Sequence, residues 1–116
     1  MKEDNVIKEK SVKFAIRAVE MYKYLSETKQ EYVMSKQFLR SGTSIGANVS
    51  EGVYAQSRSD FISKMSIALK EAAETEYWLE LLNRTGYITE KQHNSMHEDC
   101  REVIKLLAAI VKSTKN

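Results

Sequence analysis

Three potential metal ligands share one stretch near the end of the chain. His93, His97 and Cys100 stand at positions i, i+4 and i+7, so on a helix their side chains would point to one side. Zinc accepts imidazole and thiolate ligands, but a tetrahedral site would need a fourth ligand from another segment. Cys100 also falls in the apolar periodicity of this stretch, where a free cysteine is commonly a small buried hydrophobic residue. We therefore interpret Cys100 as a core residue and expect no metal or other cofactor.

A second stretch with residues that could do chemistry contains four glutamates: Glu71, Glu74, Glu76 and Glu80. Carboxylates in helical bundles can do acid–base work or bind metals. They can also compensate the charge of nearby cations, and packing against Arg40 or neighbouring lysines is the use we favour here. No glycine-rich phosphate loop follows a predicted strand, and no Cys-x-x-Cys pair is present. We expect no catalytic residues and no enzymatic activity.

The elements that position these side chains are helices. The 116 residues include no proline, four glycines and 42% hydrophobic residues, which favours one compact all-α domain over residues 1–116. Apolar residues recur at helical spacing in four segments, with short links between them. The pattern predicts an antiparallel up-down-up-down four-helix bundle with helices at about 4–28, 33–54, 58–85 and 89–112. Capping patterns begin at Ser57 and Thr89, and Gly52 and Gly86 are expected to end helices.

Charge and cysteine content limit the environment of the chain. Eighteen basic and 16 acidic residues leave a formal net charge of +2, too balanced to demand a nucleic-acid partner. The single cysteine cannot form an internal disulfide, and no apolar run near the start resembles a signal peptide. No stretch has the roughly 20 apolar residues that a membrane helix needs. We expect a cytoplasmic protein with no membrane contact.

The first helix carries more apolar residues than one neighbouring helix would cover. Its main seam consists of Ile7, Phe14, Ala18, Met21, Tyr22 and Leu25, and a second stripe is expected to widen the buried face: Val12, Ile16 and Val19. Basic residues follow another side of this helix, with a smaller group further along the chain. These candidate phosphate contacts, whose alternative role is ordinary solvated charge, are Lys10, Lys13, Arg17, Arg58 and Lys64.

The second helix is unusual because it retains interior glycines. Gly42 and Gly46 stand four residues apart, in an apolar seam predicted to include Leu39, Val49 and Val53. An interior glycine costs about 0.5–1 kcal/mol relative to alanine, so close approach of a partner helix must offset that cost. A polar stripe lies beside this seam, and it is either a solvated face or a partly buried network that includes Glu74. The stripe consists of Arg40, Ser44, Asn48 and Glu51.

The third helix has a second apolar stripe beside its inner seam. Ile67, Trp78 and Leu81 make this stripe, with Glu74 among them. A lone bundle buries one face of each helix, so these residues indicate an oligomer interface, where tryptophan is enriched. The alternative is that Trp78 packs beneath a loop or helix end of its own subunit.

Several segments together resemble a bacterial four-helix-bundle family first noticed in intervening sequences of large-subunit ribosomal RNA genes. The resemblance spans about Lys10 to Lys112, and it implies a bundle that assembles into a homopentameric ring. The chain is also similar to the accessory variability protein of diversity-generating retroelements, a more basic pentameric barrel that binds reverse transcriptase and nucleic acid. The segments are Arg40-Ser41-Gly42, Ser44-Ile45-Gly46-Ala47-Asn48, Glu51-Gly52, Ser59-Asp60-Phe61, Ser66-Ile67-Ala68-Leu69, Glu74-Thr75 and Trp78-Leu79.

The sequence thus predicts a non-enzymatic homo-oligomeric scaffold whose partner is RNA or a ribonucleoprotein. Repetition of a weak basic patch around a ring would raise avidity without a strong patch on each subunit. The alternative is a protein-interaction module that binds no nucleic acid.

Overall fold

The predicted all-α four-helix bundle is confirmed by the computed structural model, which describes residues 2–114. Regular structure in this part of the chain is entirely helical. No helix in it is long and apolar enough to cross a membrane. The elements are α1 (Lys2–Lys23), a π-helical turn η1 (Tyr24–Thr28), α2 (Met34–Val53), α3 (Arg58–Arg84) and α4 (Glu90–Thr114).

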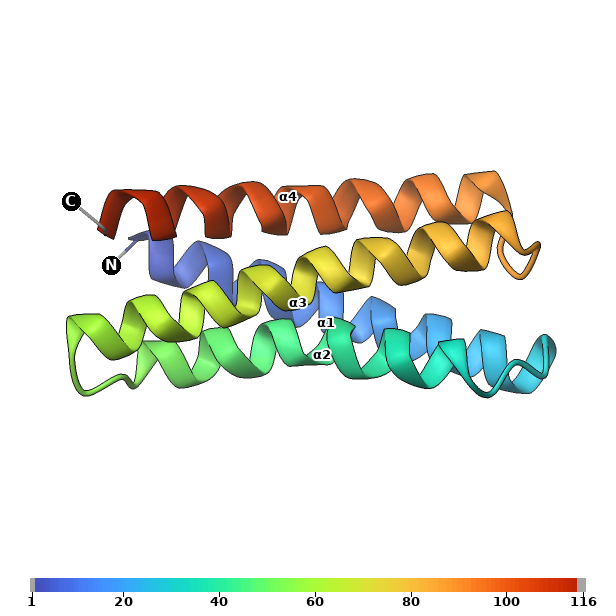
Figure 1. The fold of residues 1–116 in the computed structure, drawn as a ribbon, viewed down its shortest axis with the longest axis horizontal. Helices are drawn as coiled ribbons and strands as arrows, with labels where there is room; N and C mark the ends of the chain where they lie inside the picture. The colour runs from blue at the N-terminus through green and yellow to red at the C-terminus, as the bar shows by residue number, and fades with distance from the viewer. Residues whose placement is uncertain (1, 115–116) are drawn as a thin grey trace.

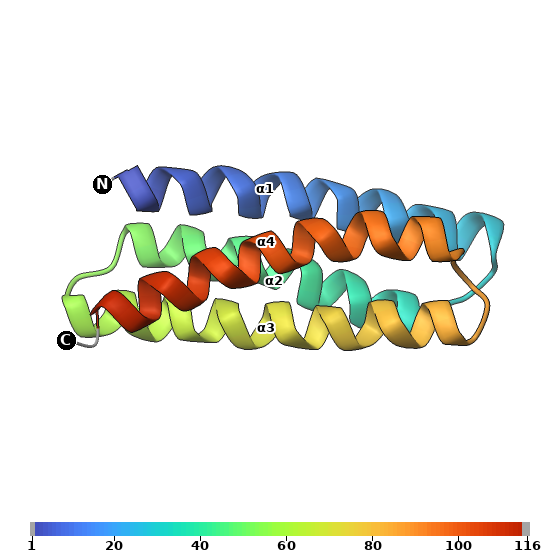
Figure 2. The same cartoon turned by 90° about the horizontal axis from the view of Figure 1, so that it is seen from above.

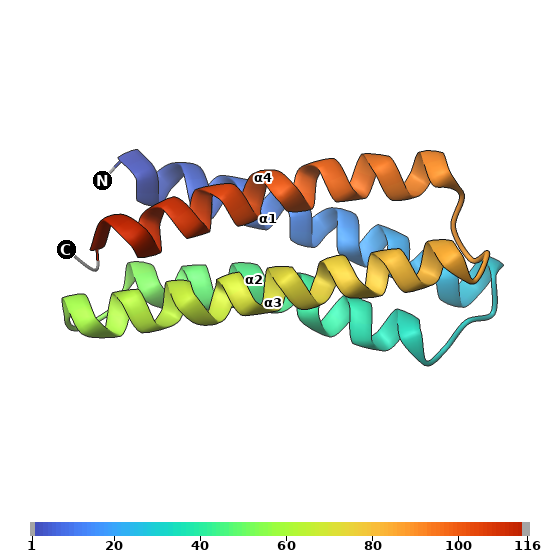
Figure 3. The same cartoon turned by 45° about the horizontal axis from the view of Figure 1, so that its top comes forward.

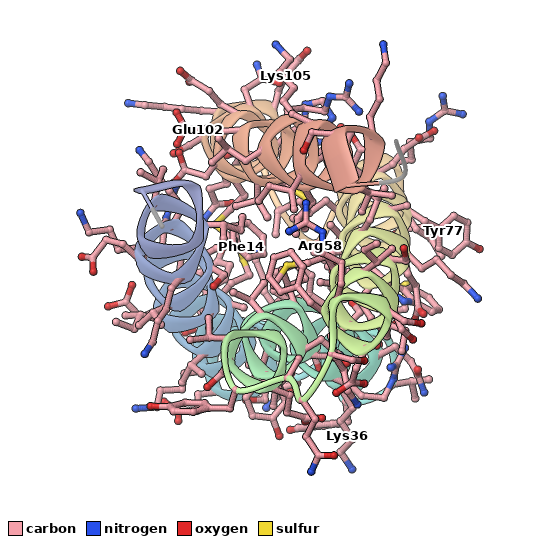
Figure 4. All side chains as sticks on the ribbon, turned by 90° about the vertical axis from the view of Figure 1, so that its left-hand side faces the viewer. Phe14, Lys36, Arg58, Tyr77, Glu102 and Lys105 are labelled. Atoms are coloured by element: carbon pink, nitrogen blue, oxygen red, sulfur yellow. The ribbon has the colours of Figure 1, made fainter. Side chains whose placement is uncertain are left out.

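The four helices lie side by side along a body of 44 × 20 × 18 Å (Figure 1). The view from above shows that both termini and the α2–α3 link lie at one end, while the other two links lie at the opposite end (Figure 2). An intermediate view shows the same up-down-up-down order (Figure 3). Seen end-on, the helices occupy four corners, and Phe14 points between them whereas Lys36 and Tyr77 point outward (Figure 4).

Each helix contributes apolar side chains to one core. The predicted seam of α1 and η1 is buried at Ile7, Phe14, Ala18 and Leu25, whereas Met21 and Tyr22 are half-buried. Cys100 is also buried and takes part in this core, as predicted. Other fully buried members of the cluster are Phe38, Ile45, Val49, Met65, Leu79, Leu82 and Leu107.

Two glycines let α1 and α2 approach closely. A Cβ added at Gly42 would lie 2.9 Å from the Cβ of Ala18, closer than such atoms tolerate. A Cβ at Gly46 would lie 3.4 Å from the backbone oxygen of Ser11. The cost of the two glycines in a helix is therefore offset by close contact between helix backbones, as their spacing predicted.

The predicted seam of α2 was partly wrong. Val53 is exposed and Leu39 is only half-buried, whereas Phe38 and Ile45 fill the core instead. Gly52 does not end the helix: it is buried within α2, and a Cβ there would lie 2.7 Å from the Cε of Met65. Gly52 therefore serves close packing between α2 and α3.

The second apolar stripe of α1 also differs from the expectation. Val12, Ile16 and Val19 are 47%, 54% and 37% exposed, so they do not widen the buried face. The neighbouring helices approach α1 from the other sides of its seam, and the stripe is left on the outside of the bundle.

The ends of α3 and α4 follow the predicted capping chemistry. The Ser57 hydroxyl accepts a hydrogen bond from the Asp60 amide. At α4 the capping box is reciprocal, because the backbone N–H of Gln92 donates to the Thr89 hydroxyl and the backbone N–H of Thr89 donates to the side-chain oxygen of Gln92. Gly86, two residues after the end of α3, has a φ of +85°, which confirms it as a helix stop.

The start of α2 depends on a buried carboxylate that the sequence pattern did not reveal. The Glu31 side chain accepts hydrogen bonds from the amides of Val33, Met34 and Ser35, at 3.2, 3.1 and 2.7 Å. Burial by itself raises the pKa of Glu31, but these backbone donors outweigh it and hold the pKa below its usual range. Glu31 therefore satisfies the free amides of the first turn of α2.

Replacement of Gly42 by leucine should force α1 and α2 apart. We expect Gly42→Leu to lower the free energy of unfolding by about 1–3 kcal/mol or more, because overfilled contacts displace backbone. Ala47→Leu is the matched control, since Ala47 is exposed on the same helix; it should change stability by less than about 0.5 kcal/mol. Chemical denaturation measures both, and equal stability of the two variants would contradict the close contact.

The Glu31 cap should make stability depend on acid pH. Because folding lowers the pKa of Glu31, its contribution is present above about pH 4.3, the ordinary glutamate value, and is lost as pH falls through the lower folded-state value. We expect Glu31→Gln to cost about 1 kcal/mol at pH 7 and to weaken the decline of stability below about pH 4.3. Denaturation curves from pH 3 to 7 measure this, and identical pH profiles would disprove the role of the carboxylate.

Candidate assembly interface

Arg40 joins α2 to α3 through two carboxylates. Its guanidinium lies 2.9 Å from Glu71 and donates a second hydrogen bond to Glu74. The Trp78 indole N–H donates to the same Glu74 oxygen at 2.9 Å. The hydrogen bond from Arg40, followed by that from Trp78, lowers the pKa of Glu74, and the bond to Glu74 raises the pKa of Arg40. The network therefore fixes one edge of the indole ring.

The rest of the predicted polar stripe makes separate contacts. Asn48 donates to the Ser44 carbonyl at 2.9 Å and to the Ser44 hydroxyl at 3.2 Å, within α2. Glu51 lies 2.9 Å from Lys64 of α3. Arg40 and Glu74 thus share one network, while Ser44 and Asn48 form a second unit and Glu51 a third.

Behind the Arg40 network lies a buried hydroxyl pair that the sequence did not single out. The Thr75 hydroxyl lies 2.8 Å from the Ser41 hydroxyl and 2.8 Å from the Glu71 carbonyl, and both residues are buried. In the sequence analysis, Ser41 and Thr75 stood only as members of the segments that carry the family resemblance. The signal that could have found them is their place on the inner, otherwise apolar side of each helix.

The three candidate interface residues differ in exposure. Ile67 is 40% exposed, whereas Trp78 and Leu81 are half-buried. The Trp78 ring packs edge-on against Tyr77, with 4.9 Å between ring centroids, and contacts the core from outside. The outer face of α3 therefore combines an exposed aliphatic side chain with a partly covered indole of fixed orientation.

Most of the candidate phosphate contacts already have carboxylate partners. Lys10 lies 2.8 Å from Glu102, and Arg17 lies 2.7 Å from Asp99. These pairs join α1 to α4, and the hydrogen bond to Glu102 raises the pKa of Lys10. Lys13 pairs with Glu9 at 3.7 Å, Lys64 pairs with Glu51, and Arg58 alone of the five has no ion pair within residues 2–114.

The histidines and Cys100 do not converge. The Cys100 thiol points into the core toward the Ala72 carbonyl, and burial raises its pKa to about 12. His93 and His97 instead stack, with ring centroids 5.3 Å apart, beside an open groove of about 560 Å³. His97 lies 2.9 Å from Glu76. Across the described residues, no group of three or more potential ligands is arranged to hold a metal ion.

The other two glutamates of the acidic stretch are paired with cations, but with arginines and a histidine instead of the expected lysines. Glu76 lies 3.3 Å from Arg101 as well as beside His97, and Glu80 lies 3.1 Å from Arg84.

Residues Gly42 to Gly46 match the Gly-x-Ser-x-Gly pattern of hydrolase nucleophiles, but here the pattern lies inside α2 rather than at a strand-to-helix turn. Ser44 is occupied with Asn48.

Comparison with known proteins agrees with this architecture. The family model described as 23S rRNA-intervening sequence protein matches residues 3–109. The chain belongs to this family. A crystal structure from Bacteroides thetaiotaomicron, of a protein with unknown function from the S23 ribosomal protein family, is 61% identical to the chain. The match covers 95% of this chain and 98% of that one, with a TM-score of 0.93. No curated protein matches the chain.

Removal of Arg40 should weaken the hydrogen-bond network between α2 and α3 that holds the Trp78 indole. We expect Arg40→Met to lower stability by about 1 kcal/mol or less, because the Arg40 side chain is 51% exposed and solvent screens its ion pairs. The loss should shrink in high salt. Denaturation followed by Trp78 fluorescence measures it, with Lys36→Met as an exposed control on the same helix. A loss that is independent of salt would contradict the ionic role.

Proposed function

We propose that this protein is a non-enzymatic scaffold that assembles with copies of itself. The observation that carries the proposal is apolar surface left outside a complete core, on α1 at Ile16 and on α3 at Ile67. Contiguous exposed apolar side chains typically mark interaction sites. Five subunits is the number that the family resemblance implies, and the ring is part of this proposal.

The fixed indole of Trp78 supports an interface on α3. Tryptophan residues near the centre of an interface often dominate its binding energy. The hydrogen bond to Glu74 already orders the ring in one subunit, so less side-chain entropy would be lost on assembly. Leu81 lies on the same helix, one turn further along, and would extend the contact.

RNA or a ribonucleoprotein is our second candidate partner. The family is named for the intervening sequence of 23S ribosomal RNA. Arg58 and Lys105 are exposed and have no ion-pair partner in the part of the chain that the structure describes, and Figure 4 shows Lys105 pointing outward from α4. In a ring these charges would be repeated, which raises avidity for a phosphate backbone.

The ion pairs of Lys10 and Arg17 favour the alternative, a module that contacts protein alone. A cation that is already paired must release its carboxylate before it can hold a phosphate. Binding of RNA through these two residues would therefore be weaker than their number implies.

Native mass measurement tests the scaffold. We expect the wild-type chain to be an oligomer at micromolar concentration, and Trp78→Ala to reduce assembly with little change in helix content. Tyr32→Ala is the control, since Tyr32 is 54% exposed and lies in the link between α1 and α2, away from Trp78. A wild-type monomer would disprove self-assembly.

RNA binding is tested separately by gel shift. The shift should weaken steeply as salt rises, and the absence of a shift at low salt would leave the protein-interaction module as the remaining hypothesis.

A further inference from the structure

The exposed stripe of α1 is a second apolar face, distinct from the one on α3. Val12, Ile16 and Val19 follow one another at helical spacing, and each is more than one-third exposed. Three branched aliphatic side chains in one row differ from the scattered exposed residues of ordinary surfaces. The core is complete without them, so any partner that covers this row must come from outside the subunit.

The face formed by α2 and α3 carries the other apolar row. Ile67 and Trp78 stand along α3. The side of α2 that adjoins them carries Arg40, Ser44 and Glu51, of which Arg40 and Glu51 pair with α3. The short side chain of Ser44 lets another helix approach this face closely.

We infer that the α1 stripe of one copy packs on the α2–α3 face of the next copy. This inference rests on the proposed self-assembly and specifies its interface. Because the two faces are different, each copy uses both, once with each neighbour. Such contacts are heterologous, and they generate a closed ring when the rotation between copies closes. A two-fold dimer would use one face twice and leave the other exposed.

The heights of the two faces along the bundle agree. Gly42 lies against both Ala18 and Thr75, so these three residues mark one level. Helices α1 and α3 run in the same direction (Figure 1). Val12 is six residues before this level and Ile67 is eight, a difference of about 3 Å at 1.5 Å per residue.

At the other end of each face, Val19 is one residue past the level of Ala18, and Trp78 is three residues past Thr75. The α3 row therefore extends about 3 Å beyond the α1 row at each end. Copies related by rotation about an axis parallel to the helices therefore bring Val12 to Ile67 and Val19 to Trp78.

The charges that flank the faces are complementary under the same rotation. Glu20 lies two residues past Ala18, and Arg40 lies at the same height because α2 runs in the opposite direction. Toward the other end, Lys8 and Glu51 are level to within one residue, counted from Ala18 and Gly42. An acid of α1 thus lies level with a base of α2 at one end, and a base lies level with an acid at the other, where they would join the ion pairs that Arg40 and Glu51 already make with α3. A second copy of this chain matches the stripe in apolar height, and the charges at its two ends are opposite in sign.

Two variants separate the faces. Val12→Asp/Ile16→Asp places charge on the α1 stripe, and Ile67→Asp places it on the α3 face. Each should be a folded monomer by native mass measurement and circular dichroism. Val6→Asp is the matched control, since Val6 is also on α1 and is 44% exposed, but lies on a different side of the helix. It should assemble as the wild type does.

Mixing the two variants provides the decisive test. One variant retains the α3 face and the other retains the α1 stripe, so a heterologous interface predicts a one-to-one heterodimer that grows no further. If the charged α1 variant does not fold, Val12→Ser/Ile16→Ser replaces it in the same experiment. Monomers that stay apart on mixing, or an α1 variant that assembles as the wild type does, would overturn this interface while wild-type assembly stands. A monomeric wild type would refute the proposed function itself.

Discussion

The close approach of α1 and α2 at Gly42 is the constraint on which the rest of the bundle depends. With no side chain at this position, Ala18 of α1 sits almost against the α2 backbone, and Thr75 of α3 reaches the same point from the other side. One level of the bundle is thereby fixed for three helices at once. Every residue further along each helix then has a set height, because a helix rises by a constant 1.5 Å per residue. The apolar and charged residues of the outer surface inherit their positions from this contact.

Polar groups specify this packing without being exposed to solvent. The Ser41–Thr75 hydroxyl pair lies inside the α2–α3 contact, and the Thr75 hydroxyl also bonds the Glu71 carbonyl. A buried hydroxyl without a partner costs about 1–3 kcal/mol, so a shift of α2 along α3 would be penalised. Arg40 reinforces the same register from outside through Glu71 and Glu74. Apolar burial holds the helices together, while these bonds select one alignment.

The sequence predicted the helices well because periodicity and capping are local. The reciprocal Thr89–Gln92 bonds and the turn at Gly86 needed only a few adjacent residues. The predictions that failed concerned the direction in which a helix face points and contacts between residues far apart in the sequence. Periodicity shows that α1 has a wide apolar arc, but not that its neighbours would leave Ile16 outside. A glycine near a helix end fits a stop as well as a close contact, which is why Gly52 was misjudged. Ion pairs such as Arg17–Asp99 join residues 82 positions apart and leave no local pattern.

The pairing of surface charge bears on the two kinds of contact that the sequence suggested. When Lys10 or Arg17 binds a phosphate, it first loses a carboxylate partner at 2.8 or 2.7 Å, and the net gain is the difference between two similar interactions. The exposed part of an apolar side chain has no such competitor in the free subunit, because that part contacts only water. Their burial therefore contributes its full value of about 25 cal/mol per Å² of apolar area, before the cost of association. On this ground we favour contact between subunits over contact with nucleic acid as the use of this surface.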